Sequence, residues 1–262
     1  DALAEMNVLG ILVGAILLGL AAAISLPRDS AVPKIFDELA QVTYKLAGWV
    51  LTMLPVGLFA ITFQLAQKID FSTLTALGQL AGIVFAATLF HGLVVLPTIA
   101  WLVSGKNPLQ FLRAVSQPMV TALFTSSSAA TLPLSMQTAQ DKLGVDQARS
   151  AFVLPLGATA NMDGTALFEG IAAVFLAYMF GVELGTTGVI AIFLVAMLSS
   201  VGAPGIPSGS MAGMQMVLLA VGIPLEAIGL LLLIERPLDT FRTAVNVEGD
   251  LVGCLVAKRF AS

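Results

Sequence analysis

The feature that most constrains this chain is a polar interruption inside the long apolar run from Ala151 to Tyr178. The interruption, Pro155 to Thr165, has the sequence PLGATANMDGT. A carboxylate such as that of Asp163 costs about 2.5–3.5 kcal/mol at the centre of a membrane helix on insertion scales. Non-helical backbone is tolerated at that depth only where protein or water satisfies it. A helix broken here would offer its freed carbonyl oxygens, the amide of Asn161 and the carboxylate of Asp163 to a small cation. A polar kink that only packs helices together is the alternative interpretation.

The composition indicates a multi-pass membrane protein. Of the residues, 58% are hydrophobic and only 11% are charged, whereas a soluble domain carries about 25% charged residues. The net charge of -4 therefore says little about partners, and we expect membrane lipid but no nucleic acid among them. The single cysteine, Cys254, excludes an internal disulfide and a cysteine-rich metal site. The single histidine, His91, is expected to be a hydrogen-bonded packing residue rather than a proton carrier.

The N-terminal part of the chain predicts ordinary membrane-spanning helices. The runs Val8 to Ile24, Leu46 to Leu65 and Leu74 to Val103 are long enough to cross most of a bilayer. The polar stretch Arg28 to Glu38 is expected to be a loop and a helix start, and Pro55 a kink. No signal peptide is recognisable before the first run, so we expect the sequence to begin part-way through a longer protein.

The C-terminal part predicts an all-α membrane fold with two re-entrant helical hairpins. The serines 126–128 lie between apolar halves that are too short to cross a bilayer, which predicts a first hairpin at about 114–140. The stretch GAPGIPSGS, Gly202 to Ser210, cannot continue a helix and predicts a second hairpin at about 187–222. A broken helix at about 150–180 lies between them, and a last helix follows at about 225–257.

Two short segments of the C-terminal part share one pattern. Asn161 to Thr165 and Asn246 to Asp250 both have the order Asn, apolar, acid, Gly, polar. Together with the two similar hairpins, this weak symmetry fits the inverted repeats of secondary transporters, which bind their substrates between the repeats.

The last helix carries a polar stripe. Its members lie three or four residues apart and therefore share one helix face, which should be turned toward protein or a cavity rather than lipid. Asp239 and Arg242 could simply neutralise each other. No basic residue occurs between Arg149 and Arg236, so we expect bound cations or protons to balance the remaining acids. The stripe consists of Glu235, Asp239, Arg242, Thr243, Asn246 and Asp250.

Four segments in this order resemble the glutamate/aspartate transporter family, also called dicarboxylate/amino acid:cation symporters. They are TSSSAATLP (Thr125 to Pro133), PLGATANMDGT, GAPGIPSGS and DTFRTAVNVEGD (Asp239 to Asp250). The resemblance covers essentially the whole chain, which is similar to the family from its fourth transmembrane helix to its end. It implies a homotrimer in the cell membrane (inner or plasma membrane) that works as an elevator-type transporter and not as an enzyme. It assigns 1–70 to trimerisation scaffold helices and 71–262 to a mobile transport domain.

The resemblance also implies a substrate site for an acidic amino acid. Asp239 would hold the amino group, and Arg242 would bind the side-chain carboxylate through a forked contact. Backbone N–H groups of the first hairpin tip would touch the other carboxylate, and the second tip would act as a gate. The implied set is completed by Ser126, Ser127, Ser128, Thr165, Ile206, Pro207, Ser208, Gly209, Ser210, Thr243 and Asn246.

Sodium ions are the coupling ions that the resemblance implies, with no other cofactor. One site would use Gly157, Asn161, Asn246 and Asp250. A second would use backbone oxygens of Thr159, Ser200, Val201 and Ala203. A third would include Asn161 and Asp163, with its remaining ligands on a third helix that this chain lacks. Substrate would bind well only after cations offset the acids, which links the two binding events.

Three features depart from the family pattern. Ser126 and Thr240 stand where members carry an additional arginine, so we expect a more negative site and no support for potassium counter-transport. Glu169 stands where animal members have a glutamate associated with proton co-transport, and burial favours its uncharged form. We therefore expect proton coupling alongside sodium, unless this glutamate only hydrogen-bonds between helices. Pro237 is expected to bend the last helix locally.

The predicted function is sodium-coupled uptake of aspartate or glutamate, with the proton coupling expected from Glu169. A proton-only glutamate permease and a dicarboxylate carrier are alternatives, although Asp239 would be unmatched by a dicarboxylate. An intramembrane protease would need His91 beside a serine such as Ser208, or a dyad of Asp163 and Asp250. A passive anion channel is a further class.

Overall fold

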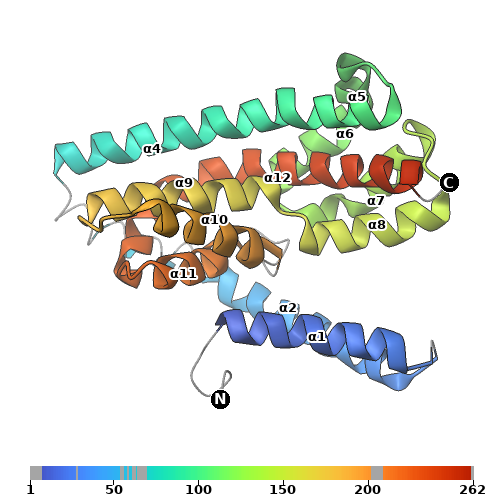
Figure 1. The fold of residues 1–262 in the computed structure, drawn as a ribbon, viewed down its shortest axis with the longest axis horizontal. Coiled ribbons are helices and arrows are strands. Elements are labelled where there is room, and N and C mark those ends of the chain that lie inside the picture. Colours follow the sequence, from blue (N-terminus) through green and yellow to red (C-terminus); the bar gives the residue numbers. More distant parts are fainter. Residues whose placement is uncertain are drawn as a thin grey trace. The chain divides into compact units, whose positions relative to one another are not determined.

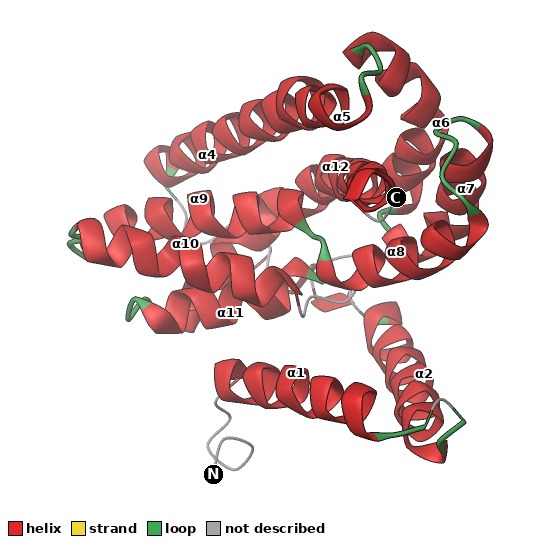
Figure 2. Cartoon of the chain, turned by 45° about the vertical axis from the view of Figure 1, so that its right-hand side comes forward, coloured by secondary structure: helices red, strands yellow, loops and turns green. Residues whose placement is uncertain are grey.

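The computed structural model describes residues 8–27, 29–53, 70–201 and 209–260, and five positions between 56 and 63. Every regular element in these ranges is helical, and none of these residues lies in a strand (Figure 2). The predicted all-α class is therefore confirmed. The chain divides into two compact units, Asp1–Ile69 and Asp70–Ser262, which are described separately. Their roles as scaffold and transport domain stay predictions.

The first unit contains helices α1, Val8–Ser25, and α2, Ala31–Thr52. Helix α1 is apolar throughout, as its sequence predicts. Helix α2 begins earlier than expected, because Pro33 lies in its first turn, where a missing backbone N–H costs no hydrogen bond. Most of the stretch expected to be a loop is therefore helix. The predicted kink at Pro55 lies outside the described residues.

The second unit begins with one continuous helical stretch. It comprises α4, Phe71–Phe90, the π-helical segment η1, His91–Val95, and α5, Leu96–Ser104. Asp70 caps its start by accepting a hydrogen bond of 2.9 Å from the backbone N–H of Thr73. Hydrogen bonds from Thr73 lower the pKa of Asp70 to about 2. Among the described helices, Phe71–Ser104 and Gln147–Met179 are long and apolar enough to cross a membrane.

Helices α6, Pro108–Thr125, and α7, Ser128–Asp141, form a packed pair. Helix α6 ends at Ser126, whose φ of 49° is the left-handed conformation that stops a helix. Ser127 then starts α7, because its side chain accepts a hydrogen bond of 3.2 Å from the backbone N–H of Ala130. The turn between the two helices therefore lies within the serine cluster.

Two further interruptions follow along the chain. Helices α8, Gln147–Ala160, and α9, Asp163–Met179, are separated at Asn161 and Met162. Helices α10, Thr186–Val201, and α11, Ser210–Ala220, pack against each other and against α9. The break between α8 and α9 falls inside the stretch PLGATANMDGT, as its polar residues predict.

The last element is a short 3-10 turn, η2, Leu225–Ala227, followed by the long helix α12, Ile228–Phe260. Helix α12 is continuous through Pro237 and packs along α4, α6, α8 and α9 (Figure 1). One apolar cluster surrounds its first part and includes Phe168, Met214 and Leu231. A second includes Phe111 and Leu251 near its other end. Along α12, the polar stripe begins after Leu231 of the first cluster and ends before Leu251 of the second.

Candidate functional site

The polar stripe of α12 is buried inside the second unit. Each of its residues is at most 6% exposed. The burial agrees with the expectation that the stripe faces protein, and it means that every charge on the stripe needs a partner. The members are Glu235, Asp239, Arg242, Thr243, Asn246 and Asp250.

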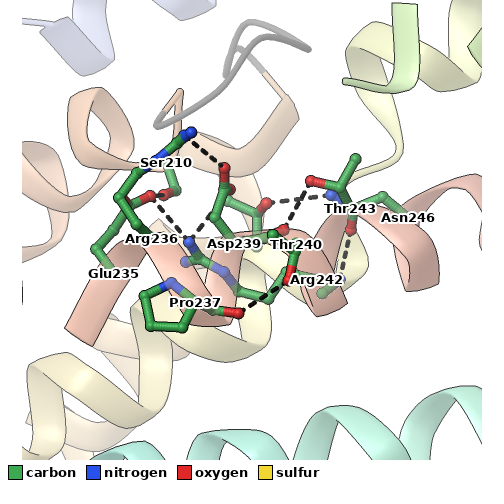
Figure 3. A network of polar contacts seen from close by, with 11 residues as sticks. Ser210, Glu235, Arg236, Pro237, Asp239, Thr240, Arg242, Thr243 and Asn246 are labelled. Atoms are coloured by element: carbon green, nitrogen blue, oxygen red, sulfur yellow. Dashed lines mark hydrogen bonds and ion pairs between the residues drawn. The ribbon is translucent and has the colours of Figure 1, made fainter. Parts of the chain in front are cut away.

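Arg242 lies at the centre of a charged cluster (Figure 3). Its NH2 atom is 3.1 Å from Oε1 of Glu235 and 3.3 Å from Oδ1 of Asp239. The guanidinium also lies 4.0 Å from the ring centroid of Phe168 on α9, a cation–π contact. The hydroxyl of Ser210 donates to Glu235 at 3.5 Å. The pairing of Asp239 with Arg242, which the sequence left open, is therefore present.

Arg236 is a charged neighbour that the sequence analysis did not consider. Its NH1 atom lies 3.7 Å from Oδ2 of Asp239 (Figure 3). Arg236 therefore places a positive charge beside Asp239, and the more negative site expected from Ser126 and Thr240 stays a prediction. The sequence did indicate this ion pair, because Arg236 and Asp239 are one helical turn apart.

The helix break between α8 and α9 meets α12 through side-chain hydrogen bonds. Nδ2 of Asn161 donates to Oδ1 of Asp250 at 3.1 Å. The backbone N–H of Gly164 donates to Oδ1 of Asn246 at 2.8 Å, and Nδ2 of Asn246 donates to the hydroxyl of Thr165 at 3.2 Å. The two segments that share the Asn-apolar-acid-Gly pattern thus contact each other, although they are far apart in the sequence.

Two glycines allow carboxylates to approach the backbone closely. A Cβ atom at Gly157 would lie 2.6 Å from Oδ1 of Asp250, and one at Gly249 would lie 2.9 Å from Oδ2 of Asp163. Hard oxygen atoms of the kind that sodium prefers therefore gather around the break. No group of three or more His, Cys, Asp or Glu side chains is placed to hold a metal ion within the described ranges. A cation here would thus depend on backbone and amide oxygens as well.

His91 contacts the same region from the π-helical segment. Its Nε2 atom lies 2.8 Å from Oδ2 of Asp163. The prediction of a hydrogen-bonded histidine is confirmed. Its partner could not be found from local spacing, since 72 positions separate the two residues. Single π-helical turns often occur at functional sites.

A cavity of about 780 Å³ extends from the break along α9 and α10. Its polar end includes His91, Asn161, Asp163 and Ser200, and its walls are mainly apolar. Val201 also lines it. Two predicted ligands of the second sodium site, Ser200 and Val201, thus share one cavity with Asn161 and Asp163.

The other predicted site residues do not line this cavity or lie outside the described residues. Thr159 is exposed near the end of α8 and is absent from the lining of that cavity. Ser126 and Ser128 are buried at the turn between α6 and α7. Gly209 precedes α11, whose first residue is the buried Ser210. Ala203, Ile206, Pro207 and Ser208 lie outside the described residues.

Glu169 lies on α9, where this helix meets α10, α11 and α12. Its side chain is fully buried, and it accepts a short hydrogen bond from the hydroxyl of Ser199 on α10. A Cβ atom at Gly213 of α11 would lie 2.2 Å from its Oε1 atom, so this carboxyl group fills the space that the glycine leaves. Arg242 of α12 is close enough to interact with it electrostatically.

Glu248 is a buried acid that the sequence analysis did not single out. Its side chain is fully buried, and neither carboxyl oxygen has a hydrogen-bond partner among the residues that the structure describes. A Cβ atom at Gly92 of η1 would lie 3.2 Å from its Oε2 atom. The sequence feature that could have identified Glu248 is its position next to the polar stripe, in the segment NVEGD.

Comparisons with known proteins agree with one another. The model of the sodium:dicarboxylate symporter family matches residues 1–260. Excitatory amino acid transporter 3 of Bos taurus is 37% identical over 257 residues, which cover 98% of this chain and 49% of that protein. Neutral amino acid transporter B(0) of Mus musculus is 40% identical over 250 residues, with 95% and 45% covered. A putative sodium-dependent excitatory amino acid transporter, glt-4 of Caenorhabditis elegans, is 38% identical over 258 residues, with 97% and 51% covered. The chain spans about half the length of the curated relatives it matches.

Proposed function

The chain belongs to the sodium:dicarboxylate symporter family, and we propose that it forms the substrate- and ion-binding part of a sodium-coupled transporter of acidic amino acids. Members of this family are membrane transporters and not enzymes. The intramembrane protease considered above is therefore excluded. Sodium is the coupling ion of the family.

The observation that carries the proposal is the buried Arg242 beside Asp239. A buried guanidinium donates strong, charge-assisted hydrogen bonds to a carboxylate, and the Nε and Nη1 atoms of Arg242 have no hydrogen-bond partner among the described residues. Those donors are available to a substrate carboxylate. Asp239, next to it, supplies the negative charge that an ammonium group requires. An amino acid with an acidic side chain carries both groups.

We propose that sodium ions bind around the helix break, at Asp250 with Asn161 and at Asp163. A buried carboxylate without a full counter-charge repels an anionic substrate in a medium of low polarity. Cation binding removes that repulsion, so the substrate binds more tightly to the sodium-loaded protein. Such a differential affinity is sufficient to couple the two fluxes.

Movement and proton coupling complete the proposal. The pairs α6–α7 and α10–α11 would be the re-entrant hairpins, and the second pair would gate the site of a homotrimeric, elevator-type carrier. Glu169 would carry a co-transported proton, because it lies buried between the proposed gate helices and Arg242. Its hydrogen bond from Ser199 links its charge to the position of α10.

A neutral amino acid is the second candidate substrate. One of the similar relatives is named a neutral amino acid transporter. Arg242 favours the acidic substrate, since a neutral side chain would leave its free N–H donors buried without an acceptor.

The test is uptake of radiolabelled aspartate and serine into vesicles that contain the full-length protein. Sodium and pH gradients are imposed independently. The proposal expects aspartate uptake that requires the sodium gradient and exceeds serine uptake. Uptake driven by the pH gradient alone would instead support a proton-only carrier, and a flux that no gradient can drive uphill would indicate a channel.

A further inference from the structure

Arg242 has two acidic partners, and a second arginine contacts only one of them. One nitrogen of Arg242 contacts both Glu235, at 3.1 Å, and Asp239, at 3.3 Å. A single buried positive charge thus faces two buried carboxylates. The second oxygen of Asp239 instead faces Arg236, at 3.7 Å. With all four groups ionised, Arg236 supplies the charge that makes the cluster electrically neutral.

The two arginines differ in how firmly they are held. The side chain of Arg242 is 1% exposed and packs on Phe168, whereas that of Arg236 is 45% exposed. An ion pair at such an exposed position is weak and can exchange partners. Arg236 can therefore leave Asp239 when another cation binds there, while Arg242 stays in place. Figure 3 shows Arg236 and Arg242 reaching Asp239 from positions on the same helix.

We propose that Arg236 increases the preference of this site for amino acids with an acidic side chain, beyond what Arg242 provides, an inference that rests on the proposed function. A substrate ammonium group that binds Asp239 takes the place of Arg236 on that carboxylate. The released guanidinium remains at the edge of the site and attracts the net negative charge of an acidic amino acid. A neutral amino acid has no net charge, so its affinity gains little from Arg236.

Removal of Arg236 therefore acts unequally on the two substrate classes. Without it, the cluster carries one unbalanced negative charge before the substrate arrives. An acidic amino acid adds a second one, whereas a neutral amino acid adds none. The affinity for aspartate should fall while the affinity for serine should change little.

The experiment measures equilibrium binding of L-aspartate and L-serine to the purified full-length protein at fixed sodium concentration. It compares the wild type with Arg236→Gln and with Arg236→Lys, which keeps the positive charge. Arg149→Gln is the matched control, because Arg149 also pairs with an acid one helical turn away, Asp146, at the start of α8. Melting temperatures verify that each variant is folded.

We expect Arg236→Gln to weaken aspartate binding about tenfold, or 1.4 kcal/mol, with serine binding almost unchanged. Arg236→Lys should restore most of the loss, and Arg149→Gln should alter neither affinity. If the wild type binds aspartate but Arg236→Gln leaves the ratio of the two affinities unchanged, the inference fails and the proposed function stands. If the wild type binds neither amino acid in sodium, both the inference and the proposed function fail.

Discussion

At the scale of single residues, the site depends on buried acids whose surroundings differ. Asp239 and Glu235 have arginine partners, whereas Asp250 contacts an amide and Glu169 a hydroxyl. Burial penalises an ionised carboxylate strongly when no cation lies beside it. The acids without an arginine ion pair are therefore the ones expected to take up a sodium ion or a proton from outside.

Glu169→Gln tests the proton role. Glutamine keeps the size of the side chain and can still accept a hydrogen bond from Ser199, but it cannot release a proton. Aspartate uptake by the variant should therefore become independent of pH, while the wild type slows at alkaline pH, where the carboxyl loses its proton. Uptake is measured over a pH series at constant sodium gradient. A variant with the same pH profile as the wild type would leave Glu169 as a hydrogen-bonding residue only.

Glu248→Leu tests whether burial of Glu248, whose carboxyl has no hydrogen-bond partner among the described residues, lowers the stability of the fold. Replacement of a buried polar group that lacks a partner by an apolar side chain should stabilise the fold by about 1–3 kcal/mol. The measurement is the thermal unfolding temperature in detergent. Glu235→Leu is the control, and it should lower that temperature, because it deprives the buried Arg242 of a partner. An equal loss of stability in both variants would show that Glu248 is also paired.

At the scale of elements, the helix interruptions were more predictable than their geometry. Glycine, serine and asparagine in apolar runs correctly indicated the turn at Ser126 and the break at Asn161. The π-helical turn at His91 had no local signal in the sequence, and its contacts are with α12 and with the distant Asp163. The start of α2 at Ala31 was missed because proline was treated as a breaker rather than as a first-turn residue.

Ser126→Gly tests the geometry of the turn between α6 and α7. Ser126 has a left-handed backbone conformation, which costs most residues about 1–2 kcal/mol and costs glycine almost nothing. The variant should unfold at an equal or higher temperature than the wild type. Its aspartate affinity should be retained, because the proposed substrate contacts of this turn use backbone N–H groups. Ser126→Val is the opposing variant and should lower the unfolding temperature. A loss of aspartate binding in Ser126→Gly would show that the side chain itself is required.

At the scale of the whole molecule, the sequence predicted the polar face of α12 better than its charge pairing. Helical periodicity was sufficient to place Asp239, Arg242, Asn246 and Asp250 on one buried face. It could not distinguish which acid has an arginine and which does not, because that depends on side-chain directions and on contacts between distant segments. Arg236 and Glu248 were missed although both lie on this helix, close to the stripe in the sequence.

The arrangement of the second unit joins the two proposed binding events on a single element. Helix α12 carries the proposed substrate residues Asp239 and Arg242, and the proposed ion ligands Asn246 and Asp250, within a few turns. Ions that bind at the break between α8 and α9 therefore act on the same helix as the substrate. The central claim is that cation occupancy at these carboxylates permits an acidic amino acid to bind.

The most direct test is aspartate binding to the purified full-length protein in sodium chloride and in choline chloride at equal ionic strength, for the wild type and for Asp250→Asn. The account predicts at least about tenfold tighter binding in sodium for the wild type, and a smaller difference for the variant. Equal affinity of the wild type in the two salts would contradict it.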